Sequence, residues 1–313
     1  MAEQTKEMRA AYVDALMALA EKNNNIVVLE ADLMSCTNTG VFKKAYPDRF
    51  FNVGIAEANM VGIASGLSTL GKIPFASSFG CFSSRRVFDQ FFLSANYAKL
   101  NVKLVGTDPG VTAAFNGGTH MPFEDLALMR VVPGLTIVEP SDPVSCAAYV
   151  RLMAEDYGCH YLRIPRKPVP YLYQENEAFK FGKAKLLKEG KDLCFIALGS
   201  LMVNQSIKAC ESLSESGISA GVLDVLTLKP IDCNAILEQA GKVRAIISAE
   251  NAQIAGGLGS AVAEILAENG CRCKFARIGI RDEFGEVGTQ DYLTNRFGLD
   301  VGNLVKKAQE LLK

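Results

Sequence analysis

The stretch from Arg49 to Phe79 reads RFFNVGIAEANMVGIASGLSTLGKIPFASSF. It begins with a run typical of a short strand, residues 49–53, passes into a segment whose small residues suit a closely packed helix, and ends in a second strand, residues 73–77. One carboxylate, Glu57, enters that helix among small and apolar side chains. Burying a carboxylate in such surroundings is costly unless it has a partner. Glu57 is therefore either a helix-start residue held by free backbone N–H groups or a functional acid.

The chain on both sides of this stretch alternates apolar strands with helical segments. Continuous apolar strands separated by helices predict a parallel sheet that is covered on both faces. Three prolines at 165–170 and a charged, poorly periodic segment interrupt the pattern, which then starts again at Leu193. We predict an α/β protein of two consecutive domains, each with a mostly parallel sheet flanked by helices: residues 1–172, a linker at 173–192, and residues 193–313.

The individual elements follow from the same patterns. In the first domain we expect a helix at 6–22 and strands at 26–30, 102–106 and 135–138, with the alternation of strands and helices continuing to Arg163. In the second domain we expect strands at 193–200, 220–226, 245–250 and 274–278, with helices at 203–214, after 229–232, and at 261–269. The glycine-rich turn 256–260 is predicted to pack closely at a helix start and not to bind a cofactor, because it lacks a phosphate-binding spacing.

Composition excludes several classes of protein. The 313 residues are 49% hydrophobic and 21% charged with a net charge of −1, which argues against a nucleic-acid or an anionic-membrane surface. No apolar run is long enough to span a membrane, and residues 1–9 lack the apolar core of a secretory signal. The nine cysteines and two histidines show no metal-site spacing. We therefore expect a cytoplasmic protein in a reducing compartment that ligates no metal by itself.

Residues 54–67, GIAEANMVGIASGL, resemble the cofactor-pyrimidine (PYR) domain of thiamine-diphosphate enzymes, most closely that of transketolases. The family motif is close to GIAEQNMVGIAxGL, and Ala58 replaces its glutamine. The second half is similar to the C-terminal domain that follows PYR in transketolases, through ALGS at 197–200 and GGLGS at 256–260. The resemblance implies that Glu57 is catalytic: it bonds a ring nitrogen of the cofactor's aminopyrimidine and favours the tautomer that deprotonates the thiazolium carbon.

The resemblance also implies residues around the cofactor ring. Phe79 and Phe82 match the two phenylalanines that flank the aminopyrimidine, and Arg85 stands where a tyrosine is common. His120, in a loop similar to the family's DGPTHQP, matches a catalytic histidine that points at substrate hydroxyls. In that loop Asn116 stands where an aspartate is usual, and Thr107 where a histidine is usual. Without the resemblance, the phenylalanines would be read as core residues and His120 as an ordinary loop histidine; His160 is predicted to be structural.

A third set of residues is implied to bind the sugar phosphate. Arg9 and Arg166 match two arginines that hold it in transketolases, and Arg163 is the alternative to Arg166. Guanidinium forks suit phosphate because two parallel donors match two oxygens. The family's phosphate-binding serine is shifted to Ser35 or replaced by Cys36. Asp32 matches an aspartate that approaches the cofactor across the boundary between subunits; its alternative role is a helix N-cap.

The second cofactor-binding domain of transketolases, the PP domain, has no counterpart here, because no Gly-Asp-Gly occurs in the chain. The resemblance therefore implies the C-terminal subunit of a split transketolase of pentose phosphate metabolism, which works with an N-terminal subunit in an α2β2 assembly. Thiamine diphosphate would be shared, and Mg²⁺ held mainly by the partner. The reaction implied is transfer of a two-carbon ketol unit from a ketose phosphate to an aldose. The alternatives are a 2-oxoacid dehydrogenase β subunit, a deoxyxylulose-phosphate-synthase-like enzyme, and a non-catalytic scaffold.

Overall fold

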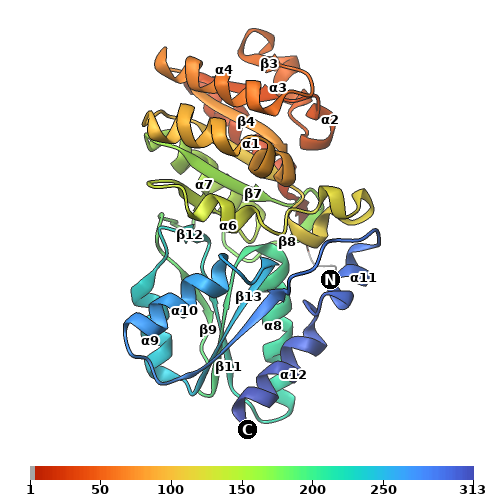
Figure 1. Ribbon diagram of the computed structural model, residues 1–313, viewed down its shortest axis with the longest axis vertical. Coiled ribbons are helices and arrows are strands. Elements are labelled where there is room, and N and C mark those ends of the chain that lie inside the picture. Colours follow the sequence, from red (N-terminus) through yellow and green to blue (C-terminus); the bar gives the residue numbers. More distant parts are fainter. Residues whose placement is uncertain (1–3) are drawn as a thin grey trace.

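The computed structural model describes residues 4–313 and shows two α/β halves stacked along the long axis (Figure 1). The N-terminal half contains a seven-stranded sheet in the order β12-β6-β7-β5-β4-β2-β3, and the C-terminal half a five-stranded sheet in the order β14-β13-β10-β11-β9. The predicted fold class, two α/β domains with mostly parallel sheets, is confirmed.

In the seven-stranded sheet every neighbouring pair is parallel except β12 with β6. Helices cover both faces, because successive side chains of each strand point to opposite sides. In β4, for example, Phe75 packs in the cluster under α1 and α7, whereas Ala76 packs in the cluster under α4. The strands are β2 (Ile26–Glu30), β3 (Phe50–Asn52), β4 (Ile73–Phe79), β5 (Lys103–Thr107), β6 (Thr136–Val138), β7 (His160–Ile164) and β12 (Thr227–Lys229). The helical elements are α1 (Met8–Lys22), α2 (Met34–Thr37), α3 (Gly40–Ala45), η1 (Pro47–Arg49), α4 (Glu57–Thr69), η2 (Phe82–Arg86), α5 (Phe88–Gln90), η3 (Phe91–Tyr97), η4 (Gly110–Asn116), η5 (Gly118–His120), α6 (Asp125–Arg130) and α7 (Pro143–Glu155).

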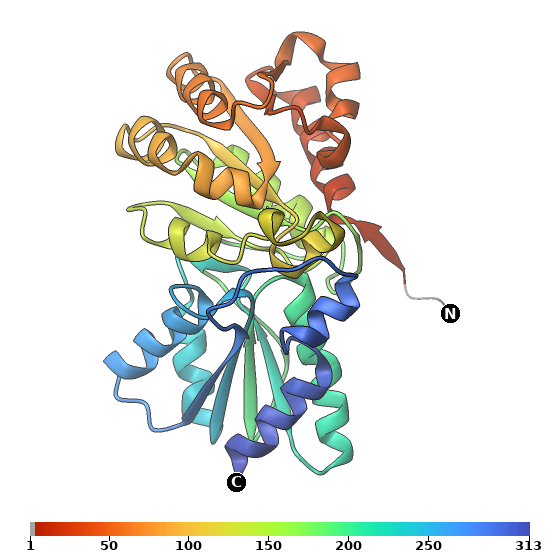
Figure 2. The ribbon, with the colours of Figure 1, turned by 45° about the vertical axis from the view of Figure 1, so that its right-hand side comes forward.

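The five-stranded sheet is parallel apart from its edge strand β9, which pairs antiparallel with β11. Figure 2 shows α8, α11 and α12 on one side of this sheet and α9 and α10 on the opposite side. Its strands are β9 (Lys185–Lys188), β10 (Leu193–Ala197), β11 (Ala220–Asp224), β13 (Ala245–Gln253) and β14 (Lys274–Ile280). Its helices are α8 (Gly199–Glu215), α9 (Cys233–Lys242), α10 (Leu258–Glu268), α11 (Gln290–Arg296) and α12 (Val301–Leu312). A further two-stranded ribbon joins β1 (Thr5–Glu7) to β8 (Pro168–Pro170).

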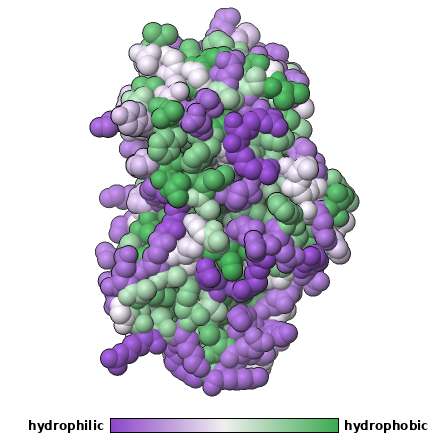
Figure 3. Space-filling model, in the orientation of Figure 1, coloured by the Kyte–Doolittle hydropathy of each residue, from purple (hydrophilic) through white to green (hydrophobic). Residues whose placement is uncertain are grey.

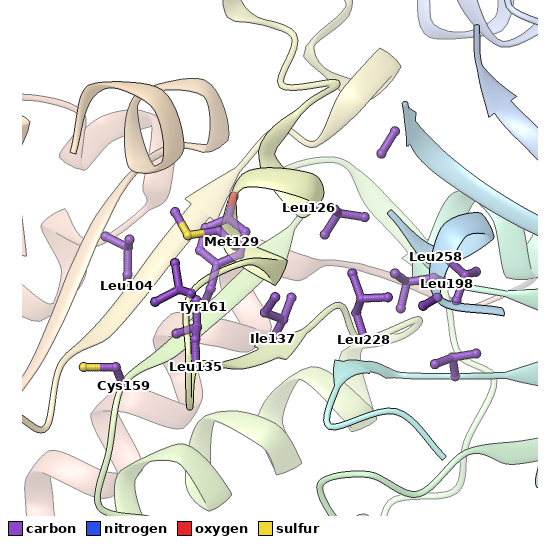
Figure 4. Close-up of a cluster of buried hydrophobic side chains, with 14 of the residues drawn as sticks. Leu104, Leu126, Met129, Leu135, Ile137, Cys159, Tyr161, Leu198, Leu228 and Leu258 are labelled. Atoms are coloured by element: carbon purple, nitrogen blue, oxygen red, sulfur yellow. The ribbon is translucent and has the colours of Figure 1, made fainter. Parts of the chain in front are cut away.

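One hydrophobic core runs through both halves (Figure 4). Leu126, Met129 and Ile137 of the first half belong to the same buried cluster as Leu198 and Leu258 of the second. Leu228, on β12, lies between them, because that strand leaves the second half and pairs with β6 of the first sheet. The two sheets are thus joined by packing and by backbone hydrogen bonds as well as by the chain.

Most predicted elements are present, but several differ in their bounds; helix α10, for example, begins at Leu258 and not at Ala261. Helix α8 begins at Gly199 and not at Val203. The predicted strand 220–226 is divided, because Leu226 has a φ of 58° and turns the chain from β11 into β12 of the other sheet. Strand β9 lies inside the segment predicted as the linker and belongs to the second sheet. The exact domain boundaries stay a prediction.

The surface of the molecule is mixed in character. On the face shown in Figure 3, hydrophobic residues lie among hydrophilic ones and form no single continuous belt. Between residues 4 and 313, none of the helices has both the length and the apolar character that crossing a membrane requires.

Candidate functional site

The carboxyl ends of five parallel strands meet at one edge of the seven-stranded sheet. Strands β2, β3, β4, β5 and β7 all end there, since Glu30 is in register with Asn52 and Ser77, and Thr107 with Phe79 and Ile164. Ligands of parallel α/β sheets bind outside this edge. Every residue predicted for the site lies at the end of one of these strands, on the segment that follows it, or, for Arg9, in the first turn of α1 directly after the ribbon strand β1.

Glu57 is the first residue of α4, reached through a turn at Gly54 with a φ of +74°. Its side chain is only 1% exposed. The carboxylate does not rest on free backbone N–H groups; both of its oxygens accept from Nη1 of Arg86, at 2.8 and 2.9 Å. The Arg86 side chain is itself 47% exposed. A buried acid is therefore neutralised by a cation that reaches in from the surface.

Two phenylalanines and a histidine form an aromatic cluster that is connected to this acid through Arg86. The rings of Phe79 and Phe82 have their centroids 6.1 Å apart, tilted by 33°. His120 presents an edge to both rings, with centroid distances of 6.0 and 5.3 Å. The guanidinium of Arg86 lies over the face of Phe82, 4.0 Å from the ring centroid. The structure thus links Glu57 through Arg86 to Phe82, and Phe82 to Phe79 and His120; we call Glu57, Phe79, Phe82, Arg86 and His120 the Glu57 pocket.

A hollow of about 430 Å³ lies beside three of these side chains, and it is lined by Phe82, Arg86 and His120, together with Cys81, Arg85 and Thr119. Arg85 lies on its rim. The Nε of Arg85 is 2.9 Å from Oε1 of Glu124, and its Nη2 donates to the carbonyl of Thr119 at 3.0 Å. The Thr119 hydroxyl in turn lies 2.9 Å from Nδ1 of His120. Arg85, for which we predicted contact with the cofactor, is thus bonded to the loop that carries His120.

The loop that departs from the family pattern is well packed. Thr107 is buried and donates to Oδ2 of Asp108 at 3.2 Å, so its hydroxyl is used within the protein. Asn116 is half-buried, and among residues 4–313 its side-chain nitrogen has no hydrogen-bond partner. A buried amide donor without a partner is costly, which makes Asn116 a candidate contact for a bound ligand.

The two arginines predicted to bind phosphate lie at the same end of the ribbon β1–β8, and one of them, Arg166, bonds the Asp108 carboxylate. Pairing of β1 with β8 places Glu7 opposite Pro168, so Arg9 and Arg166 project from the same end of the ribbon. Arg166 donates from Nε to Oδ1 of Asp108 at 2.7 Å. Burial raises the pKa of Asp108, while the positive charges of Arg166 and then Arg9 oppose that rise. Arg9 is also held by the Glu7 carboxylate at 2.8 Å and by the carbonyl of Cys36 at 2.9 Å.

Arg163, the alternative to Arg166, is excluded from this surface. It is completely buried and donates to Asp125 at 2.7 Å and to Glu139 at 2.8 Å. Because the strand β7 ends at Ile164, Arg163 still points into the protein and Arg166 lies beyond the sheet edge. His160, which is predicted to be structural, is likewise buried, with its Nδ1 3.0 Å from Nζ of Lys103.

Asp32 lies exposed at the end of β2 and is not a helix N-cap, since α2 begins at Met34 with Leu33 as its cap. Its backbone has a φ of 62°, and its N–H donates to Oδ1 of Asn52 at 3.0 Å. Beneath it, the fully buried Glu30 accepts from the hydroxyls of Thr37 and Thr39 at 2.6 and 2.7 Å. Glu30 therefore fixes the loop that carries Asp32 at one end and the Arg9-binding Cys36 at the other.

Glu30 should make stability depend on pH. Burial raises its pKa from 4.5 to about 8. The folded state keeps the proton over this range and the unfolded state releases it, so this contribution to stability is lost as pH rises from 4.5 through about 8. In Glu30→Gln, which retains an acceptor for both threonines, we expect the free energy of unfolding to fall by about 3–4 kcal/mol less than in the wild type between pH 5 and 9. Urea denaturation at both pH values checks this. The other titrating groups are common to both proteins, so equal falls would contradict it.

Sequence reasoning missed Arg86, the partner of the central acid. Two arginines stand side by side at 85 and 86, and only the direction of the π-helical turn η2 decides which of them faces Glu57. The turn 256–260, in contrast, lies at the start of a helix, α10, as predicted. The first N–H groups of α10, at Leu258 and Gly259, both donate to the buried Glu250 at 2.7 Å, so these two donors are used within the protein.

Comparison with known proteins gives matches over nearly the whole chain. A family model described as "Transketolase, pyrimidine binding domain" matches residues 4–170, and one described as "Transketolase, C-terminal domain" matches residues 182–304. A 6-deoxy-6-sulfo-D-fructose transketolase subunit of Clostridium sp. (strain MSTE9) is 49% identical over 305 residues, which is 97% of this chain and 94% of that protein.

Two further matches have the same extent. One of the subunits of an apulose-4-phosphate transketolase of Phocaeicola vulgatus is 36% identical over 307 residues, 97% of each chain. A solved structure described as "Split gene transketolase, inactive beta4 tetramer" superimposes with a TM-score of 0.90 at 42% identity and covers 98% of both chains.

Proposed function

Since the chain belongs to the transketolase family, where it corresponds to the C-terminal subunit of split transketolases, we propose that it supplies the pyrimidine-binding half of a thiamine-diphosphate-dependent ketol transferase. The reaction would move a two-carbon ketol unit from a ketose to an aldose. The observation that carries this proposal is Glu57, an almost fully buried acid at the ligand-binding edge of the sheet whose cation partner comes from the surface.

The side chains of the Glu57 pocket fit the aminopyrimidine of this cofactor. The space between the Glu57 carboxylate and the Phe82 ring already accepts a planar group that donates N–H bonds on one side and offers a flat face on the other, namely the Arg86 guanidinium. A protonated aminopyrimidine has the same two properties. Phe79 and the edge of His120 would shield such a ring from water.

Thiamine diphosphate supplies the carbanion chemistry when it is bound. We assign the chain's own residues to five tasks. Glu57 would share a proton with a ring nitrogen, favoured by the low hydration of its site. Phe79 and Phe82 would orient the ring, and His120, held by Thr119 and Arg85, would face the substrate hydroxyls. Arg9 and Arg166 would bind the far, anionic end of the sugar, and Asp32 would approach the cofactor where two subunits meet.

A second polypeptide is needed to complete this site. Among residues 4–313, no cluster of three or more His, Cys, Asp or Glu side chains could hold a metal ion. We propose that an N-terminal subunit with a PP domain binds the diphosphate and its divalent ion, in an assembly of two copies of each chain. The similar split-gene protein is described as inactive when its β chains form a tetramer alone.

The ionic character of the Arg9–Arg166 site suggests the substrate class. Its two guanidinium groups are balanced by two carboxylates, Glu7 and Asp108. The similar proteins act, by their names, on a sulfonated sugar and a sugar phosphate. We propose that the substrate is a sugar with a terminal anion, either phosphate or sulfonate. A sulfonate carries one negative charge and a phosphate up to two. The nearly neutral site therefore favours the sulfonate on electrostatic grounds.

Reconstitution tests the proposed function. We expect no ketol transfer by this chain alone and transfer after mixing with the N-terminal subunit, thiamine diphosphate and Mg²⁺. The donors to compare are xylulose 5-phosphate, fructose 6-phosphate, 6-deoxy-6-sulfofructose and pyruvate, with aldose release measured by chromatography.

Each outcome separates the alternatives. Turnover of pyruvate but of no ketose would favour a 2-oxoacid dehydrogenase or a deoxyxylulose-phosphate-synthase-like enzyme. Cofactor binding without turnover of any donor would favour a non-catalytic scaffold. Full activity of the isolated chain would refute the split arrangement.

A further inference from the structure

Arg86 occupies a place that is unusual for a surface arginine. Its side chain is about half exposed, yet its Nη1 donates to both oxygens of an acid that is 1% exposed. The same guanidinium lies over the Phe82 ring at 4.0 Å. A guanidinium group donates hydrogen bonds to carboxylates from its edge and stacks on aromatic rings through its flat face. Arg86 can therefore make both contacts at once.

This position coincides with the space proposed for the aminopyrimidine ring. Any ring that bonds Glu57 and stacks on Phe82 has to lie in the plane that the guanidinium takes, because the two groups use the same acceptor and the same aromatic face. Van der Waals volumes cannot overlap, so the ring and the Arg86 side chain exclude one another.

We propose that Arg86 acts as an internal substitute for the cofactor ring: it neutralises Glu57 in the free chain and leaves the Glu57 pocket when thiamine diphosphate binds. This inference rests on the proposed function. The substitute stabilises the free chain, because Glu57 without a partner would be a buried charge. It also lowers the affinity for the cofactor, because the ring has to displace an existing ion pair before it can bind.

The displaced side chain has a place to go. Asp89 lies three residues further along, beyond the turn at Val87 that separates η2 from α5, and is exposed. Because both side chains are exposed and opposite in charge, we expect Arg86 to pair with Asp89 on the surface once the pocket is filled. Such a surface pair is weaker than the buried one, so the exchange depends on the contacts that the ring gains.

Calorimetric titration with thiamine diphosphate and Mg²⁺, on the chain assembled with its N-terminal subunit, tests this inference. We expect Arg86→Gln to bind the cofactor about tenfold more tightly than the wild type, because no charge-assisted pair has to be broken. Arg86→Lys keeps the charge but not the flat stacking group, so it should bind more tightly by a smaller factor. Arg151→Gln, which removes the same charge from an exposed position on α7, is the matched control and should equal the wild type.

Thermal unfolding of the free chain gives a second readout. Arg86→Gln should lower the midpoint, since it leaves Glu57 buried without its partner, whereas Arg151→Gln should not. If the wild type binds the cofactor and Arg86→Gln binds it with equal or lower affinity, Arg86 is not a substitute for the ring. This inference then fails, while the proposed function stands. If none of the assembled proteins binds thiamine diphosphate, the proposed function itself fails. Should Arg86→Gln not fold, the comparison of Arg86→Lys with the wild type decides.

Discussion

Glu57→Gln is expected to slow hydrogen–deuterium exchange at the thiazolium C2 of bound thiamine diphosphate by about two to four orders of magnitude, the usual loss when a positioned acid–base group is removed. Glutamine has the shape of glutamate but cannot share a proton with a ring nitrogen. Its amide oxygen can still accept from Arg86, so the fold should be retained. The measurement is NMR-detected exchange after acid quench of the assembled protein.

The control for this variant is Glu264→Gln. Glu264 also pairs with an arginine, Arg130, but on the exposed surface between α6 and α10. The Glu264→Gln variant should exchange the thiazolium C2 proton of the bound cofactor at the wild-type rate. An unchanged rate in Glu57→Gln, with circular dichroism showing an intact fold and calorimetry showing bound cofactor, would reject the assignment of Glu57 as the activating acid.

Arg163→Met is expected to cost about 3–5 kcal/mol of unfolding free energy, the range for breaking a buried ion pair from one side. Arg163 is completely buried and donates to Asp125, to Glu139 and, at 2.9 Å, to the carbonyl of Asn251 in the second half. Methionine fills a similar volume but leaves two buried carboxylates without their cation. Burial already raises the pKa of Glu139 to about 7, with the Arg163 charge opposing that rise.

Chemical denaturation measures this loss, and two variants sharpen it. Arg244→Met removes an exposed arginine that lies 3.8 Å from Asp192 and should change stability by less than about 0.5 kcal/mol. Combining Arg163→Met with Asp125→Asn and Glu139→Gln should recover part of the loss, because the uncompensated charges are removed together. A loss below about 1 kcal/mol for Arg163→Met alone would show that the buried network does not join the two halves.

The sequence was a good guide to the strands of both sheets. Fully buried parallel strands are continuous apolar runs, so β2, β10 and β13 could be found without knowledge of their neighbours. The prediction placed the end of β11 too late, because apolar residues continue through Leu226. Only the backbone turn at Leu226 separates β11 from β12, which lies in the other sheet. Helix α12 was not predicted, although Leu304 and Ala308 lie four apart and are buried on one face.

For the candidate site, the sequence indicated residue types and their order but not their directions. Glu57, Phe79, Phe82 and His120 stand in recognisable motifs, and the structure brings them together. The choice between Arg163 and Arg166 needed the end point of β7, which decides which side chain still points inward. Arg86 carries no pattern of its own, because its partner lies 29 positions away on another helix.

Strand β12 has a practical meaning for protein engineering. Because it belongs by sequence to the C-terminal half but by pairing to the sheet of the N-terminal half, the two halves are not interchangeable cassettes. In a chimera joined anywhere in 171–184, one edge strand of the seven-stranded sheet, β12, would come from the other parent. Successful recombination between relatives therefore has to preserve the fit of residues 227–229 to β6. The N-terminal and C-terminal halves of one parent are matched to each other at this strand pair.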